Sequence, residues 1–236
     1  MPRPQRTISE GNTVKKRSKY RYFSELEWAE QFMDGSLLFR SLSHFKRIED
    51  GEVRGDLREG AISFQPEGGL VMHHQRLGKS FTFPGGSFGS SVKTEEIFIL
   101  CASNSMTDEL RIRFEAKACV QILRVASLCS RIQNQLPKTA TFRAERVKYY
   151  SPANEPGAKW AFPDMIAFSK VDSYLWQDEF RFVFSLTDAL KYGSTAQQVK
   201  IPNQPPGTAV PPPPPVPRDY PMKVKALGDI CRLHKY

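Results

Sequence analysis

The 236-residue sequence is poor in the residues that build metal and disulfide sites. It has four cysteines and four histidines, no two cysteines form a C-x-x-C pair, and the histidines are not grouped at zinc-ligand spacing. We therefore expect no metal site. The thiols are predicted to be small buried apolar residues at Cys101, Cys119, Cys129 and Cys231.

Long apolar segments and common nucleotide-binding motifs are also missing. No run approaches the roughly 18 apolar residues of a membrane span, and the basic N-terminus is not followed by the apolar stretch of a secretory signal. The sequence lacks the G-x-x-x-x-G-K-S/T phosphate loop, a G-x-G-x-x-G turn after a strand and the G-x-S-x-G nucleophile elbow. These absences predict a cytoplasmic protein with no membrane association, outside those three enzyme classes.

Positive charge is concentrated at the two ends of the chain. Residues 1–19 include six basic residues and one acidic residue, and residues 200–236 include six basic and two acidic residues. Since the net charge of the whole chain is +9, the body between the ends is neutral overall. A neutral body argues against a nucleic-acid-binding surface spread over the whole fold. The ends themselves could attract phosphates, or they could be solubilising tails.

Apolar periodicity predicts one α+β domain with a mixed, mostly antiparallel sheet and a few helices. We expect a disordered basic tail (1–18), a core domain (19–201), a Pro-rich linker (202–221) and a C-terminal strand or hairpin (222–236). Residues 19–23 predict a strand. A helix should follow, with Ser24 as N-cap, Glu27 completing a capping box and Gly35 at its end. Further strands are predicted at 36–43, 95–105 and 173–185, and the segment PGGSFGSS (84–91) predicts a flexible turn.

Polar side chains gather on three of these predicted strands, in residue types that suit transfer of ADP-ribose from NAD. That reaction passes through an oxocarbenium-like state, so it needs a fixed carboxylate near the ribose. It also needs a cation for the pyrophosphate, a short hydroxyl side chain for the nicotinamide ribose and an aromatic wall for the nicotinamide ring. Residues of the right types for these four roles are Glu179, Arg21, Ser41 and Tyr22.

Two resemblances support this interpretation. The order of Arg21, Ser41-Leu42-Ser43 and Gln177-Asp178-Glu179 resembles the Arg–Ser–Glu type of ADP-ribosyltransferase, although Leu42 stands where that pattern usually has threonine. In that family the Glu is catalytic and the residue two before it shapes acceptor choice. Tyr20 and Tyr22 resemble the His-Tyr variant of the site.

Residues 19–185 also resemble a widespread family of uncharacterised bacterial proteins with a Tyr-x-Tyr strand, a Cys-x-Ser strand end and a late Trp-x-x-Glu-x-Arg. The matching pieces are YRYF, LLFRSLSHFKRIED, CASNSMTDELRIRF, ACVQIL, RVKYY and WQDEFRF, and HFKRIED lacks the usual Asn-Asp-Pro turn. Some members of this family look like remote ADP-ribosyltransferase relatives. The resemblance implies a component of bacterial defence or a toxin.

The sequence therefore predicts an ADP-ribosyltransferase-like enzyme that uses NAD to modify a protein or nucleic-acid acceptor, with its oligomeric state left open. An alternative is a non-catalytic module that binds nucleic acid or protein through its basic flanks. A minor option is a metal-dependent nuclease, and Glu179 could also form only a structural pair with Arg181. The predicted roles are catalysis for Glu179 and Gln177, NAD binding for Arg21, Tyr20, Tyr22, Ser41 and Ser43, and substrate binding for Trp176, Arg181 and Arg40.

Overall fold

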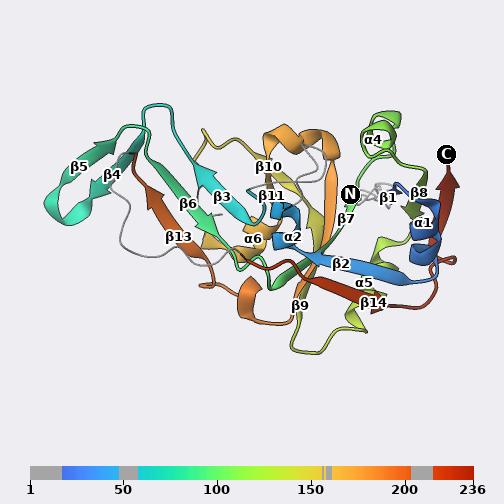
Figure 1. Cartoon of the computed structure of the whole chain (residues 1–236). Coiled ribbons are helices and arrows are strands. Elements are labelled where there is room, and N and C mark those ends of the chain that lie inside the picture. The colour runs from blue at the N-terminus through green and yellow to red at the C-terminus, as the bar shows by residue number, and fades with distance from the viewer. Residues whose placement is uncertain (1–17, 48–57, 156, 158–160, 203–214) are drawn as a thin grey trace, which may run out of the picture.

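The computed structural model has the α+β class that the sequence predicts, with mostly antiparallel strand pairing and few helices (Figure 1). It describes residues 18–47, 58–155, 157, 161–202 and 215–236. Residues 1–17 of the predicted tail at 1–18 and most of the Pro-rich segment thus lie outside the described residues. Within these ranges, no helix combines the length and apolar character needed to cross a bilayer.

The elements alternate between short strands and short helices along the chain. They are β1 (Lys19–Phe23), α1 (Leu26–Met33), β2 (Ser36–Ser41), α2 (Leu42–Arg47), β3 (Ala61–Phe64), β4 (Leu70–His74), η1 (Gln75–Leu77), β5 (Lys79–Phe83), β6 (Ser87–Ser91), β7 (Ile97–Ser103), α4 (Asp108–Arg113), β8 (Ala118–Ile122), α5 (Val125–Gln133), β9 (Thr141–Arg146), β10 (Lys148–Tyr150), α6 (Pro163–Ala167), β11 (Ser169–Val171), η3 (Asp172–Gln177), β12 (Glu179–Ser185), η4 (Asp188–Leu190), β13 (Ala196–Lys200), β14 (Asp219–Lys223) and β15 (Cys231–Lys235).

An eight-stranded antiparallel sheet forms the centre of the molecule. Its strands run in the order β14-β2-β7-β1-β8-β15, and β12 pairs with β7 on one edge and with β9 on the other. The two C-terminal strands do not pair with each other, because β14 pairs with β2 and β15 pairs with β8. Of the strand or hairpin expected at 222–236, the structure has the strand, β15, and not the hairpin. The expected linker at 202–221 ends inside a strand that begins at Asp219.

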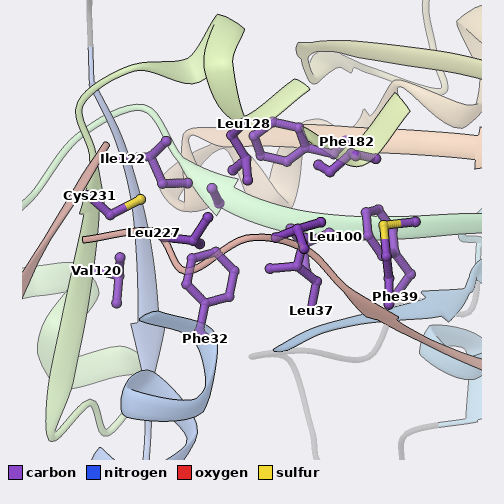
Figure 2. Close-up of a cluster of buried hydrophobic side chains, with 14 of the residues drawn as sticks. Phe32, Leu37, Phe39, Leu100, Val120, Ile122, Leu128, Phe182, Leu227 and Cys231 are labelled. Atoms are coloured by element: carbon purple, nitrogen blue, oxygen red, sulfur yellow. The ribbon is translucent and has the colours of Figure 1, made fainter. Parts of the chain in front are cut away.

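The sheet separates two apolar cores, and β12 shows how the sequence specifies this. Successive side chains of a strand point to opposite faces. Phe180, Phe182 and Phe184 join the larger core, whereas Val183 joins the smaller one. Figure 2 shows Phe182 in the larger core beside Leu128 of α5, near Leu37 and Phe39 of β2 and Leu100 of β7. Every residue of β12 is buried, so its polar members must find partners inside the protein.

Three smaller sheets extend the molecule away from this centre. They are the three-stranded sheet β13-β6-β3, the parallel pair β10-β11 and the β4-β5 hairpin. The hairpin lies at one extremity of the molecule, and β8 and β15 lie near the other (Figure 1). The turn predicted at 84–91 is found only at Pro84 and Gly85, because Ser87–Ser91 form β6 and pair with strands on both sides.

Several local predictions also need correction. The N-cap of α1 is Glu25 rather than Ser24, and no side chain caps it. Gly35 does follow the helix, with a φ of +87° that suits glycine at this position. The strand predicted at 36–43 ends at Ser41, since Leu42 starts α2. The strand predicted at 173–185 begins only at Glu179, after a 3-10 helix that contains Trp176 and Gln177.

Candidate active site

A cleft lies at a fork in the central sheet. β12 pairs with β7 along its whole length, from Ile97 to Ser103, and so occupies one edge of β7. The other edge is shared: β2 pairs there with Phe98 and Ile99, while β1 pairs only with Ser103. Between these contacts the two strands diverge, so Leu100, Cys101 and Ala102 have no strand partner on that edge.

Arg21 of β1 lies in this fork. Its Nη1 donates a hydrogen bond to the main-chain oxygen of Cys101 at 2.5 Å, which satisfies a carbonyl that the fork leaves without a strand partner. The guanidinium also lies over the rings of Phe23 and Phe32, at 5.3 and 5.8 Å from their centroids. These contacts fix a cation at the floor of the cleft, where an anionic group of a ligand would meet it.

The cleft has a volume of about 450 Å³, within the usual range for small-molecule sites. One wall comes from β1 and α1, where Trp28 is half exposed at 50%. The opposite wall comes from β2 and α2, with Arg40 and Phe45. Polar groups gather at the end of the cleft formed by the start of β12. They are Glu59, Lys170, Gln177, Glu179 and Arg181.

Four of these groups form a buried ionic cluster of two cations and two anions. Arg181 is fully buried and donates to both oxygens of Glu59, at 2.7 and 2.9 Å, and to the main-chain oxygen of Ala167. Its Nε donates to Oε1 of Glu179 at 2.7 Å. Lys170 donates to Oε2 of Glu179 at 3.4 Å and lies 3.9 Å from Glu59. The cluster is neutral overall, which is the arrangement that a low-dielectric interior tolerates.

The cluster keeps Glu179 ionised. Burial alone would raise the pKa of this carboxyl, but the charges of Arg181 and Lys170 and the hydrogen bond from Arg181 outweigh burial and lower the pKa from 4.5 to about 2. Burial alone would lower the pKa of Lys170, but the carboxylates of Glu179 and Glu59 outweigh burial and raise it. Both partners are therefore charged at neutral pH.

The turn before β12 positions Glu179 with several long-range contacts. Asp178 adopts a left-handed conformation with φ of +41°, and Asn104 donates to both its main-chain and side-chain oxygens. The main-chain N–H of Glu179 donates to the hydroxyl of Tyr149 at 2.9 Å. Lys170 also donates to Oε1 of Gln177 at 2.8 Å. The start of β12 is thus held in one geometry by residues from three other segments, at Asn104, Tyr149 and Lys170.

Seven of the ten residues predicted for the site line this one cleft: Tyr20, Arg21, Tyr22, Arg40, Gln177, Glu179 and Arg181. Tyr22 contacts Phe114, and its hydroxyl accepts a hydrogen bond from the main-chain N–H of Thr107 at 3.0 Å. Burial raises the pKa of Tyr22 to about 12, so the phenol is neutral at physiological pH. Arg40 contacts His44 at 2.7 Å.

The other three predicted residues lie outside the cleft. Ser41 and Ser43 are buried and contact each other at 2.8 Å. Ser41 accepts from the main-chain N–H of Arg218, and Ser43 donates to the main-chain oxygen of Val216, so both hydroxyls hold the chain leading into β14. Trp176 packs on Phe114 and beneath the guanidinium of Arg113. None of these three side chains is among the residues that line the cleft.

The structure also places Glu59, Cys101 and Lys170 in the cleft, three residues that the sequence analysis did not assign to the site. Their roles arise from contacts between distant segments, since Glu59 and Arg181 are 122 positions apart. The sequence carries no motif at Glu59 or Lys170 that would identify them.

The metal-dependent nuclease option needs a group of side chains that can bind a metal ion. Among the described residues, no three His, Cys, Asp or Glu side chains lie together as a metal ion would require. The carboxylate of Asp178, beside Glu179, forms an ion pair with Arg146 at 3.1 Å.

Comparison of the chain with protein-family models, with curated proteins and with solved structures found no match. The case for a function therefore depends on the geometry of the cleft.

Proposed function

We propose that the cleft binds NAD and that the chain transfers ADP-ribose to a protein or nucleic-acid acceptor. The observation that carries this proposal is the convergence of three distant segments on one cleft of about 450 Å³. β1 contributes a cation and two tyrosines, β2 contributes a second cation, and β12 contributes an ionised carboxylate. An anionic dinucleotide with two ribose units and two aromatic rings needs these kinds of groups.

The pyrophosphate and the two aromatic rings of NAD would each contact a side chain of suitable chemistry in the cleft. Arg21 and Arg40 would bind the pyrophosphate, because charge-assisted hydrogen bonds to phosphate are among the stronger polar contacts. Trp28, exposed on the cleft wall, would stack on one aromatic ring, and Tyr20 or Tyr22 on the other. Ser41 has no role in this proposal, since its hydroxyl already accepts from Arg218.

Glu179 would act on the ribose beside the nicotinamide. In the reaction the C–N glycosidic bond breaks, its electron pair leaves with neutral nicotinamide, and the ribose carbon gains positive charge. A fixed carboxylate stabilises that charge without having to reorganise. The nucleophile of the acceptor then attacks the ribose carbon and loses its proton. Arg181 donates to both oxygens of Glu179, from Nε at 2.7 Å and from Nη2 at 3.3 Å, and the Glu179 side chain is among the residues that line the cleft.

The proposal is tested by measuring NAD binding and nicotinamide release separately. Glu179→Gln should leave the Kd for NAD within several-fold of wild type but lower the rate of transfer by at least about a hundred-fold, the loss typical of an electrostatic stabiliser. Arg21→Met should weaken NAD binding by about ten-fold or more. Trp176→Phe is the control, because Trp176 lies outside the cleft and should change neither quantity.

Two results would contradict the proposal. One is the absence of both NAD binding and nicotinamide release in wild type, tested with labelled NAD and with protein and nucleic-acid acceptors. The other is a Glu179→Gln variant that folds, as shown by its circular dichroism, and transfers at the wild-type rate. The basic-flank alternative predicts instead binding that weakens steeply with salt and is lost when residues 1–19 are removed.

A further inference from the structure

The β4–β5 hairpin has an unusual surface for its position at the extremity of the molecule (Figure 1). Every residue from Val71 to Thr82 is exposed. No acidic residue occurs between Glu67 and Glu95, whereas the hairpin contains Arg76 and Lys79. Neither cation has an ion-pair partner among the described residues. The hairpin is therefore a positively charged projection on a chain body that is neutral overall.

The strand register places apolar and basic side chains on one face. Met72 lies opposite Phe81, and His74 lies opposite Lys79. Residues directly opposite each other in an antiparallel pair share a face, and so do alternate residues of one strand. Met72 and Phe81, which are 44% and 45% exposed, are thus followed toward the tip by His74 and Lys79. Arg76 lies in the turn that joins the strands.

We propose that this hairpin binds single-stranded nucleic acid. Phe81 would stack on a base beside Met72, while Arg76 and Lys79 would contact the adjacent phosphates. An exposed aromatic ring next to cations is the arrangement with which proteins bind unpaired strands without base-specific contacts. A membrane surface suits the hairpin less well, because insertion of its tip would carry Arg76 and Lys79 toward the acyl chains. This inference is independent of the NAD chemistry proposed for the cleft.

The hairpin itself is built to hold its shape without a ligand. Nδ1 of His73 contacts the hydroxyl of Ser80 at 2.7 Å across the two strands. Nδ1 of His74 accepts from the main-chain N–H of Leu77, which closes the turn. Gly78 follows with a φ of +60°. Arg76, Lys79 and Phe81 take no part in these contacts, so substituting them should leave the hairpin folded.

The test is fluorescence anisotropy of the full chain with a labelled single strand of about 12 nucleotides, without NAD, at about 50 to 200 mM NaCl. Phe81→Ser should weaken binding by about ten-fold. Arg76→Glu with Lys79→Glu should weaken it by at least about ten-fold and lower the slope of log affinity against log salt by more than about 1. A duplex of the same sequence should bind less tightly than the single strand, because its bases are already stacked.

The matched control is the pair Arg124→Glu and Lys138→Glu, two exposed cations outside the hairpin, which changes the net charge by the same amount. Its affinity should stay within about three-fold of wild type, since it removes no proposed phosphate contact. Equal affinity of the hairpin variants and wild type would overturn the proposal, and so would an equal loss in the control. Binding to anionic phospholipid vesicles that depends on Phe81, with no binding to the oligonucleotide, would overturn it in favour of a membrane surface. Since NAD is absent throughout, failure of ADP-ribose transfer would leave these outcomes unchanged.

Discussion

The buried ionic cluster makes a strong prediction about stability. Glu59→Gln keeps the shape of the side chain but removes one of two negative charges, and this leaves Arg181 and Lys170 facing Glu179 alone. Glu59 is 1% exposed and Arg181 is 0% exposed, so water cannot replace the lost carboxylate. Removing one partner of a buried pair typically lowers the free energy of unfolding by about 3–5 kcal/mol. Since domains of this kind are stable by about 5–15 kcal/mol, the variant should be close to unfolding.

Urea unfolding at neutral pH, followed by circular dichroism, measures this loss. The control is Glu25→Gln, which breaks the ion pair between Glu25 and Lys117. That pair is short, at 2.8 Å, but its side chains are 48% and 62% exposed. Exposed pairs contribute about 0–1 kcal/mol, so the control should unfold at nearly the wild-type urea concentration.

A double variant tests whether charge balance is the cause. Glu59→Gln combined with Lys170→Met restores a neutral cluster of Arg181 and Glu179. We expect this double variant to be more stable, by about 1 kcal/mol or more, than the sum of the two single losses predicts. Strict additivity would refute the charge-balance argument, as would a loss below about 1 kcal/mol for Glu59→Gln alone.

Three further predictions concern Glu179, two glycines and two cysteines. The Glu179 pKa of about 2 lies below the ordinary 4.5, so its stabilisation is complete above pH 4.5 and is lost as the pH falls toward 2. The free energy of unfolding of wild type should therefore fall by about 3 kcal/mol more than that of Glu179→Gln across this window, and parallel curves in acid titration would contradict this. Gly35→Ala should lose more stability than Gly78→Ala. Both glycines have positive φ, which costs about 1–2 kcal/mol for alanine, but only at Gly35 would the new Cβ lie 2.3 Å from the Val224 carbonyl oxygen. Equal melting temperatures of the two variants would be the contrary result. Burial raises the pKa of both Cys119 and Cys231 to about 12, so iodoacetamide should modify them at least about a hundred-fold more slowly in the native protein than in urea. Mass spectrometry would detect the modification, and similar rates in both states would show that the burial is incomplete.

Strand periodicity predicted much of the fold because it depends on local sequence. The alternation of KYRYF and of EFRFVFS is enough to place Arg21 and Glu179 on strands, and the α+β class with mostly antiparallel pairing follows from the same patterns. Strand ends were less predictable. Asp178 has a left-handed conformation that usually signals glycine, and here contacts with Asn104 and Arg146 accompany it. Long-range contacts of this kind cannot be inferred from the residues that neighbour Asp178 in the sequence.

Site residues could be predicted where their type and their position on a strand were enough to identify them. They could not be predicted where their role depends on contacts with segments that are distant in the sequence. Arg21 and Glu179 were identified by type, and the structure places both on the cleft. Ser41 also had the right type, but the chain before β14 returns to β2 and occupies its hydroxyl. Glu59 and Lys170 come from segments without a motif. They belong to the site because Glu59 pairs with the buried Arg181 and Lys170 pairs with Glu179.

The pairing of β14 with β2 and of β15 with β8 has a consequence for biosynthesis. A nascent chain on the ribosome lacks the edge strands β14 and β15 until residues 219–235 have emerged. In that interval the main-chain groups of β2 and β8 are open to other polypeptides, and such open edges promote aggregation. Translation arrest upstream of Asp219 should therefore yield insoluble fragments. The cleft wall that contains Arg40 would be among the last parts of the molecule to fold, because β2 pairs with β14.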